Sequence, residues 1–230
     1  MMSEGNIDTN NLLSSHPLKN DDDYKKIKKE LDPLLTEILF ITGKVDPKYQ
    51  QFKRNMVDWQ NQFIKAITIG GKVSSIQQFR LKTDNPQLIS TIKLFEYLGL
   101  IESIGSTYVD LLLLLLISCG KDFHVERYHE APRIIHATCL DDLKGSEVSL
   151  YSKLRFLERN GLKKTIKPID RELRNDIAHL NFDVDKSGKI STIHKKHVDI
   201  NKKLNDFNKW STILTIILAE IKFYETTDRL

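Results

Sequence analysis

Apolar residues recur through most of this chain at the three- and four-residue spacing that is typical of amphipathic helices. One such stripe follows the acidic residues 21–23, which favour a helix start, and ends near Gly43. A second begins at about Pro47 and runs to Ile67, before the Gly pair at 70–71 breaks the pattern. The apolar positions of the two stripes are Ile27, Leu31, Leu34, Leu35, Ile38 and Leu39, then Phe52, Met56, Trp59 and Phe63.

The same spacing continues in the second half of the chain. Asn85-Pro86 begins another helical stretch, and residues 108–117 are apolar nearly all round, which predicts a central buried helix. In the stretch after Pro86 we expect the following side chains to face inward: Leu88, Ile92, Phe95, Leu98 and Ile101. Further helices are predicted at residues 149–158, 166–180 and 198–224, and a loop with short helical pieces at 120–147. Because no strand repeat is evident, we predict an all-α helical bundle.

Composition and cysteine usage indicate a globular cytoplasmic protein. Of 230 residues, 40% are apolar and 29% charged, which are ordinary globular values. The longest apolar run, Leu111–Cys119, is too short to span a bilayer, and we expect no signal peptide and no membrane partner. Cys119 and Cys139 fit neither a disulfide framework nor a zinc pattern, so we expect reduced thiols. Residues 1–20 are rich in Asn and Ser and predict a flexible tail.

Basic residues are concentrated in one quarter of the chain. Residues 153–203 contain 14 Lys and Arg against 7 Asp and Glu, whereas the rest contains 21 against 24. The basic excess predicts an anionic partner such as nucleic acid, although lysine-rich helix faces are often only solvated.

An Arg-Asn-Asp-Ile-Ala-His segment at 174–179 lies at the centre of this basic region. On an ideal helix of about 100° per residue, five apolar side chains of residues 166–180 share a sector of about 80°. They are Ile166, Ile169, Leu173, Ile177 and Leu180. Arg171, Asn175 and His179 then follow one another on the opposite side. The polar cluster is therefore predicted to face solvent or a second molecule.

The projection also suggests that one copy of the segment is incomplete. Arg174 lies about 140° from His179, with the small residue Ala178 between them. Two copies packed about a two-fold axis would bring an arginine and a histidine together, as a symmetric dimer requires. Asn175, one turn before His179, is placed to orient the imidazole. A surface helix with an unrelated arginine and histidine explains the same spacing.

The segment R-N-D-I-A-H resembles the signature of the HEPN superfamily: Arg, four to six residues, then His, often with Asn, Asp or His directly after the Arg. That family is an all-α bundle with the motif on a late helix, and its members commonly dimerise to form one composite cleft. Many are metal-independent endoribonucleases in toxin–antitoxin, defence or RNA-processing systems. The resemblance covers residues 85–228, so we expect a HEPN-like helical domain at 85–230 and an N-terminal helical extension at 21–84.

The resemblance implies specific roles for three residues. His179 would transfer a proton during attack of the ribose 2′-OH, Arg174 would bind the scissile phosphate, and Asn175 would orient the histidine or the phosphate. Expected products are a 2′,3′-cyclic phosphate and a 5′-OH end, with no metal and no cofactor. RNA contacts are expected at Arg171, Lys195 and Lys196. Besides RNA and a second copy of the chain, an antitoxin or regulatory protein is an expected partner. The alternative is a non-catalytic HEPN-type module that binds RNA or protein.

Two other patterns compete with this interpretation. Residues 183–194 imitate a calcium-binding EF-hand loop, but His194 stands where a bidentate Glu is required, and a short β-hairpin with a Ser-Gly turn explains the same residues. The histidines at 124, 129 and 136 lack the spacing of a zinc site. His194 and His197, beside the lysine pair 195–196, either contact RNA or begin a solvated basic helix.

Overall fold

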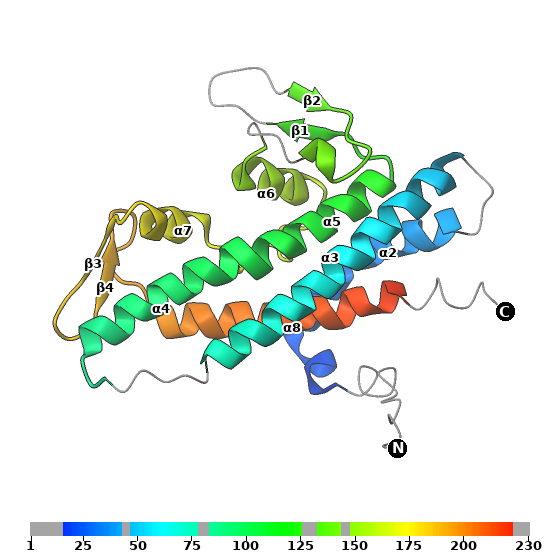
Figure 1. Ribbon diagram of the computed structural model, residues 1–230. Helices are drawn as coiled ribbons and strands as arrows, with labels where there is room; N and C mark the ends of the chain where they lie inside the picture. Colours follow the sequence, from blue (N-terminus) through cyan, green and yellow to red (C-terminus); the bar gives the residue numbers. More distant parts are fainter. Residues whose placement is uncertain (1–15, 43–46, 78–82, 126–132, 144–147, 223–230) are drawn as a thin grey trace, which may run out of the picture.

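The computed structural model describes residues 16–42, 47–77, 83–125, 133–143 and 148–222, and these are mostly helical with few and short strands. Five long segments form the body of the molecule (Figure 1). They are α2 (Asp22–Thr42), α3 (Pro47–Gln77), α4 (Pro86–Leu100), α5 (Ser106–Ser118) and α8 (Ile200–Lys222). The all-α class is therefore confirmed. Helix α8 begins two residues later than predicted. Its predicted end at residue 224 lies outside the described residues.

Helices α4 and α5 join without a break through a π-helical turn, η2 (Ile101–Gly105). The backbone N–H of Ser106 donates to the carbonyl of Ile101, five residues earlier, which is the mark of a π turn. By length and composition Pro86–Ser118 would pass for a membrane span, but 78% of its most apolar window is buried inside the protein. Residues 111–116 are buried all round, as expected for the central helix of a bundle.

The face of α4 that packs inward differs from the predicted one. Leu94, Tyr97 and Leu100 are buried, whereas Leu88 and Phe95 are exposed, so the expectation for these two residues is wrong. Helix α4 carries apolar residues on several sides, so its pattern does not single out one face. Contacts with α7 and α8 decide which side is covered.

The two N-terminal helices share one hydrophobic core with the rest of the chain. Helix α3 packs along α5, and α2 contacts α3, α5 and α8. The rings of Trp59 and Phe63 stack at 5.1 Å between centroids, both side chains being buried. Helix α3 also continues through Gly70 to Gln77, so the predicted break is wrong. A glycine within a helix costs only about 1 kcal/mol and keeps its backbone hydrogen bonds. The packing of α3 on α5 outweighs this cost.

A short hairpin and a helix cover the far end of α5. Strand β1 (Phe123–Val125) pairs antiparallel with β2 (Arg133–Ile135), and α6 (Leu150–Arg159) contacts both α5 and β1. A 3-10 turn, η3 (Asp141–Leu143), lies between β2 and α6. We expected a loop with short helical pieces at residues 120–147, and this expectation is wrong where the chain forms β1 and β2. Phe123 and Val125 are buried on either side of His124, a two-residue alternation that is typical of a strand.

At the opposite end, the hairpin expected after the motif is confirmed. Strand β3 (Phe182–Val184) pairs with β4 (Ile190–Thr192), and the turn contains Gly188 at φ +83°. A Cβ atom on Gly188 would lie 2.9 Å from the carbonyl oxygen of Pro86, so the turn fits against the start of α4. The Ser90 hydroxyl donates to the carbonyl of Gly188 at 2.8 Å, which fixes the contact.

The segment that leads into the motif helix is anchored by α2 and α8. Thr165 is fully buried, and its N–H and hydroxyl donate to the Glu30 carboxylate of α2 at 2.8 and 2.9 Å. The indole N–H of Trp210 on α8 donates to the carbonyl of Thr165 at 2.5 Å. The chain before α2 forms a short 3-10 helix, η1 (Pro17–Asn20), where a flexible tail was predicted. Residues 1–15 of that predicted tail lie outside the described residues.

Candidate functional site

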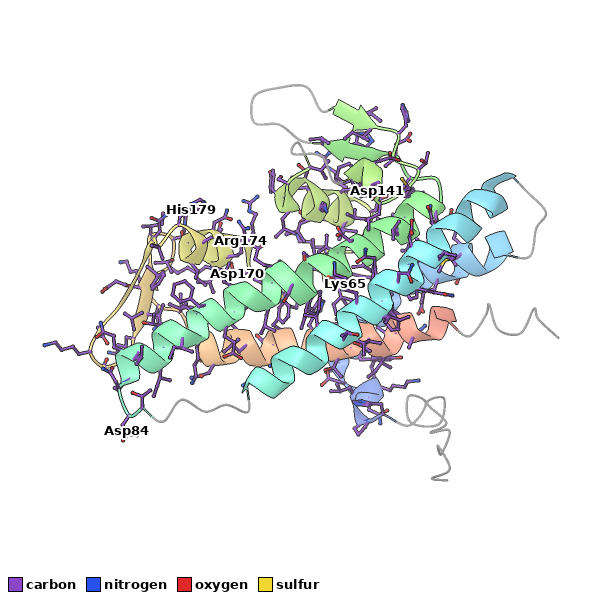
Figure 2. The ribbon with its side chains drawn as sticks, in the orientation of Figure 1. Lys65, Asp84, Asp141, Asp170, Arg174 and His179 are labelled. Atoms are coloured by element: carbon purple, nitrogen blue, oxygen red, sulfur yellow. The ribbon has the colours of Figure 1, made fainter. Side chains whose placement is uncertain are left out.

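The Arg-Asn-Asp-Ile-Ala-His segment forms helix α7 (Arg171–Ala178), which packs on α4 near the β3–β4 hairpin (Figures 1 and 2). Leu173 and Ile177 are fully buried and attach the helix to the core. The helix is shorter than the 166–180 predicted from the apolar pattern. Asp170 caps its start, accepting a hydrogen bond from the N–H of Leu173 at 3.1 Å. Pro168 also disfavours helical backbone just before it.

The helix ends at His179, in a turn that places Leu180 in the left-handed conformation at φ 57°. The N–H of Asn181 donates to the carbonyl of Asp176 at 2.7 Å, and the N–H of Leu180 to that of Ile177 at 3.1 Å. These two bonds make a Schellman ending, whose left-handed position is usually a glycine. Leu180 is 68% exposed, so its predicted place in the core stripe is wrong.

Arg174 is held in place by two neighbours. Its Nε donates to a carboxylate oxygen of Glu102 at 2.5 Å, and its Nη1 donates to the side-chain oxygen of Asn175 at 2.9 Å. Glu102 belongs to the π turn η2, so this irregular turn supplies the partner of the motif arginine. In the single chain Asn175 therefore orients the guanidinium, whereas orienting His179 was the role suggested by the spacing.

His179 is exposed at the C-terminal end of α7, and the structure gives its ring no hydrogen-bond partner among the described residues. Figure 2 shows Arg174 on this short helix and His179 at its end. Among the described residues no hydrogen bond or ion pair joins the two side chains. Leu180 and Ile193 (70% exposed) leave apolar surface in the segments just after this histidine and just after β4.

The three residues expected to contact RNA have different surroundings. The guanidinium of Arg171 lies 4.1 Å from the centroid of the Tyr151 ring, a cation–π contact. Lys195 is partly buried and pairs with Asp170, so its charge is already engaged within the chain. Lys196 is exposed. Their role in RNA binding remains a prediction.

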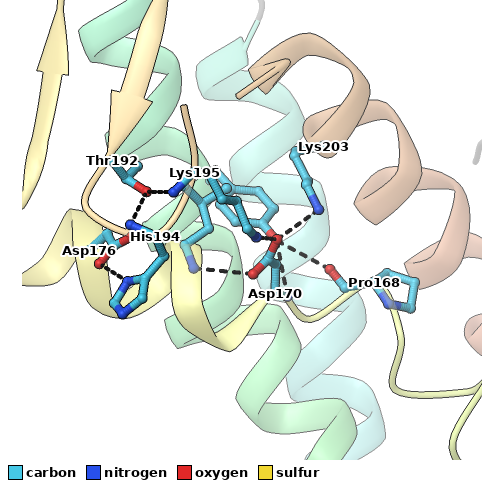
Figure 3. Close-up of polar contacts among 9 residues, drawn as sticks. Pro168, Asp170, Asp176, Thr192, His194, Lys195 and Lys203 are labelled. Carbon is cyan, nitrogen blue, oxygen red and sulfur yellow. Dashed lines mark hydrogen bonds and ion pairs between the residues drawn. The ribbon is translucent and has the colours of Figure 1, made fainter. Parts of the chain in front are cut away.

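Asp170 is the centre of a polar cluster at the start of α7. Figure 3 shows its carboxylate between Lys195 and Lys203, the latter at 2.7 Å. The Tyr97 hydroxyl accepts from the backbone N–H of Asp170 and donates to the carbonyl of Pro168, both at 3.2 Å. Burial alone would raise the pKa of Asp170, but hydrogen bonds from the two lysines outweigh it and lower that pKa to about 2. Burial also raises the pKa of Tyr97.

A second carboxylate of the motif helix is paired with a histidine. Asp176 is 1% exposed, and its Oδ1 lies 2.8 Å from Nδ1 of His194, which follows β4 (Figure 3). The other carboxylate oxygen, Oδ2, is buried without a hydrogen-bond partner. The imidazole of His194 is 49% exposed. This Asp–His pair was not predicted, because the two residues become neighbours only when the hairpin folds back on α7.

A cleft of about 450 Å³ between α2, α8 and the segment before α7 carries further basic side chains. Its lysines are Lys26, Lys164, Lys167, Lys203 and Lys209. Lys209 pairs with Asp21 and Asp23 at 2.9 and 2.7 Å, and Lys203 with Asp170, so the chain itself neutralises part of this charge.

Among the described residues no group of three or more His, Cys, Asp or Glu side chains is arranged to hold a metal ion.

Glu102 and the Asp176–His194 pair are thus the site features that the sequence pattern did not reveal. Asp176 was visible inside the motif, but its burial was not. The described cysteines form no disulfide: Cys119 is buried, which raises the pKa of its thiol to about 12, and Cys139 is partly exposed.

No family model matches the chain, and neither does any curated protein or solved structure.

Proposed function

We propose that this protein is an endoribonuclease that cleaves RNA without a metal ion, as a homodimer whose cleft combines Arg174 of one chain with His179 of the other. The observation that carries the proposal is the placement of Arg174 on a short surface helix and of His179 at its C-terminal cap, with the histidine exposed. The sequence of this helix is the part of the chain that resembles the HEPN signature. A HEPN-like domain at 85–230 and a cytoplasmic role in defence or stress belong to the same proposal.

The contacts of the two side chains support complementary roles in phosphodiester cleavage. An exposed imidazole can take a proton from a ribose 2′-OH near neutral pH. A guanidinium oriented by Asn175 presents its remaining N–H groups for a phosphate and for the charge that develops on it. Attack of the 2′-oxygen on phosphorus then breaks the bond to the 5′-oxygen. The products are a 2′,3′-cyclic phosphate and a 5′-OH end.

Exposed apolar side chains support the dimer. Leu180 and Ile193 are each about two-thirds exposed, and a leucine in the left-handed conformation is an unfavourable choice for a surface turn. Ala178, exposed on the same helix, would let a second copy approach closely. A second chain that covers these residues would place its own Arg174 near His179.

The Arg174–Glu102 contact favours a second candidate, a HEPN-type module that binds RNA or a partner protein without cleaving RNA. Glu102 neutralises the guanidinium in the single chain and occupies part of its hydrogen-bonding capacity. Under our proposal a phosphate or the second chain replaces this contact. Under the alternative the contact persists and no cleavage occurs.

The two functions are separated by incubating purified protein with RNA oligonucleotides in EDTA. The wild type is expected to produce cyclic-phosphate ends, and His179→Ala and Arg174→Ala to lose about 10²–10⁴ in rate. Lys65→Ala, on the exposed surface of α3 (Figure 2), is the matched control and should keep full activity. RNA binding without cleavage by the wild type would support the alternative. If His179→Ala cleaves as fast as the wild type, the assignment of the histidine is wrong.

Mixing the two inactive variants tests the composite site directly. A dimer of one Arg174→Ala chain and one His179→Ala chain contains one cleft with both functional residues, whereas either homodimer contains none. Random exchange should therefore restore about a quarter of the wild-type activity. If mixing restores nothing although exchange is verified by sedimentation, each site lies within one chain.

A further inference from the structure

The Asp176–His194 pair combines a fully buried carboxylate with a half-exposed imidazole. A carboxylate only accepts hydrogen bonds, so the 2.8 Å contact requires a proton on Nδ1 of His194. The other ring nitrogen, Nε2, then has no partner among the described residues and is free to exchange a proton with a bound molecule.

Hydrogen bonds of the neighbouring backbone fix the position of His194 beside the motif. The hydroxyl oxygen of Thr192 accepts from the N–H groups of His194 and Lys195 at 3.3 and 3.1 Å. The N–H of Ile193 donates to the carbonyl of Asn181, two residues after His179, at 3.3 Å. The residue that precedes His194 is therefore tied to the turn that ends α7.

The position of Asp176 on α7 brings the pair close to the proposed proton acceptor. Asp176 and His179 are three residues apart at the end of the helix, so their Cβ atoms are neighbours at about 5–6 Å. The imidazole bound to Asp176 consequently lies near the same end of α7 as the imidazole of His179. Cleavage that yields a 5′-OH end needs two proton transfers, one from the 2′-OH and one to the leaving 5′-oxygen.

We propose that His194, oriented by Asp176, is a second catalytic residue that donates a proton from Nε2 to the leaving 5′-oxygen, while His179 accepts the proton of the attacking 2′-OH. The inference rests on the proposed ribonuclease function. In the reaction the bond from the 2′-oxygen to phosphorus forms and the bond from phosphorus to the 5′-oxygen breaks. The proton lost by the 2′-OH ends on His179, and the proton gained by the 5′-oxygen comes from His194, so the charges balance.

The test uses a substrate whose leaving group needs no proton. In an oligonucleotide with one bridging 5′-sulfur at the cleavage site, the departing thiolate is stable without protonation. The matched variant is His194→Asn, because the asparagine amide can still donate to Asp176 from nearly the position of Nδ1, but cannot transfer a proton. A control is His136→Asn, which removes another Asp–His pair (His136–Asp122, 3.0 Å) beside β2, far from α7 in Figure 1.

We expect His194→Asn to cleave ordinary RNA about 10²–10⁴ times more slowly than the wild type, and the 5′-thio substrate at nearly the wild-type rate. His179→Asn should be slow on both substrates, and His136→Asn should resemble the wild type on both. Equal slowing of His194→Asn on the two substrates would indicate a structural role and overturn the inference. So would an unchanged rate on ordinary RNA, although the ribonuclease function would then stand. A wild type that cleaves neither substrate would overturn both.

Discussion

Leu180 gives a direct test of the turn that ends the motif helix. A left-handed conformation costs a residue with a side chain roughly 1–2 kcal/mol relative to the right-handed one, whereas glycine adopts it freely. Because Leu180 is 68% exposed, removing its side chain sacrifices little burial in the single chain. Glycine loses more backbone freedom on folding, which offsets part of the gain. We therefore expect Leu180→Gly to stabilise the monomer by about 0.5–1 kcal/mol.

Leu180→Ala is the matched control for that substitution, because alanine removes the same exposed side chain but keeps the backbone strain. Its free energy of unfolding should stay within about 0.5 kcal/mol of the wild type. Urea unfolding followed by circular dichroism, at a protein concentration low enough to keep the chain monomeric, measures both variants. In a chain of this size the glycine variant should melt about 1–4 °C higher. If Leu180→Gly is no more stable than Leu180→Ala, the left-handed turn is not strained.

The same two variants test whether a second chain covers Leu180. Complete burial of a leucine side chain contributes about 1.5–3 kcal/mol, so either substitution should raise the dimer dissociation constant at least tenfold. Sedimentation velocity over a concentration series measures this constant. An unchanged constant in both variants would exclude Leu180 from the interface. Stabilised monomers that associate poorly would explain why the chain keeps leucine at a glycine position.

Two further predictions concern the charges around α7. Asp170 has a folded-state pKa of about 2, below its ordinary value of 3.8, so the stability that it contributes is present above about pH 4 and disappears as the pH falls through about 2. Compared with Asp170→Asn, which keeps the helix cap, the wild type should be more stable by about 1–2 kcal/mol at pH 6, and most of this difference should be lost at pH 2. Urea unfolding across this pH range measures the difference, and a constant difference would contradict the lysine pairing. Glu102→Gln should lower the dissociation constant for RNA about two- to fivefold in a low-salt binding assay, because Arg174 loses a competing carboxylate; weaker binding would mean that Glu102 positions the guanidinium for RNA.

Local sequence chemistry predicted those parts of the fold that depend on neighbours in the chain. The Asp-Lys-Ser-Gly turn of the β3–β4 hairpin was recognisable because Asp185 accepts from the N–H groups of Ser187 and Lys189, only two and four residues away. The central helix was recognisable because residues 111–116 are apolar on every side. The end of α7 was not recognisable, because Leu180 occupies the position where a glycine would have indicated the end of the helix.

The missed parts of the site depend on contacts between distant segments. Arg174 meets Glu102 across 72 residues, and the π turn that contains Glu102 has no recognised sequence signal in this chain. Asp176 meets His194 only after the hairpin reverses the chain direction. In both cases the residue types were visible, but charged residues on helices are usually solvated, and no spacing rule distinguishes the exceptions.

These distant contacts decide how mutations at the site should be interpreted. A helix of eight residues is unstable on its own, so α7 depends on its tertiary connections. Asp170 binds two lysines, Arg174 binds Glu102 and Asp176 binds His194, so replacing any of them changes both the chemistry and the anchoring of the helix. His179 differs, since its ring has no partner among the described residues. A loss of cleavage in His179→Ala, with an unchanged melting temperature and an unchanged dimer dissociation constant, therefore reports on proton transfer, and it is the measurement on which the ribonuclease proposal depends most directly.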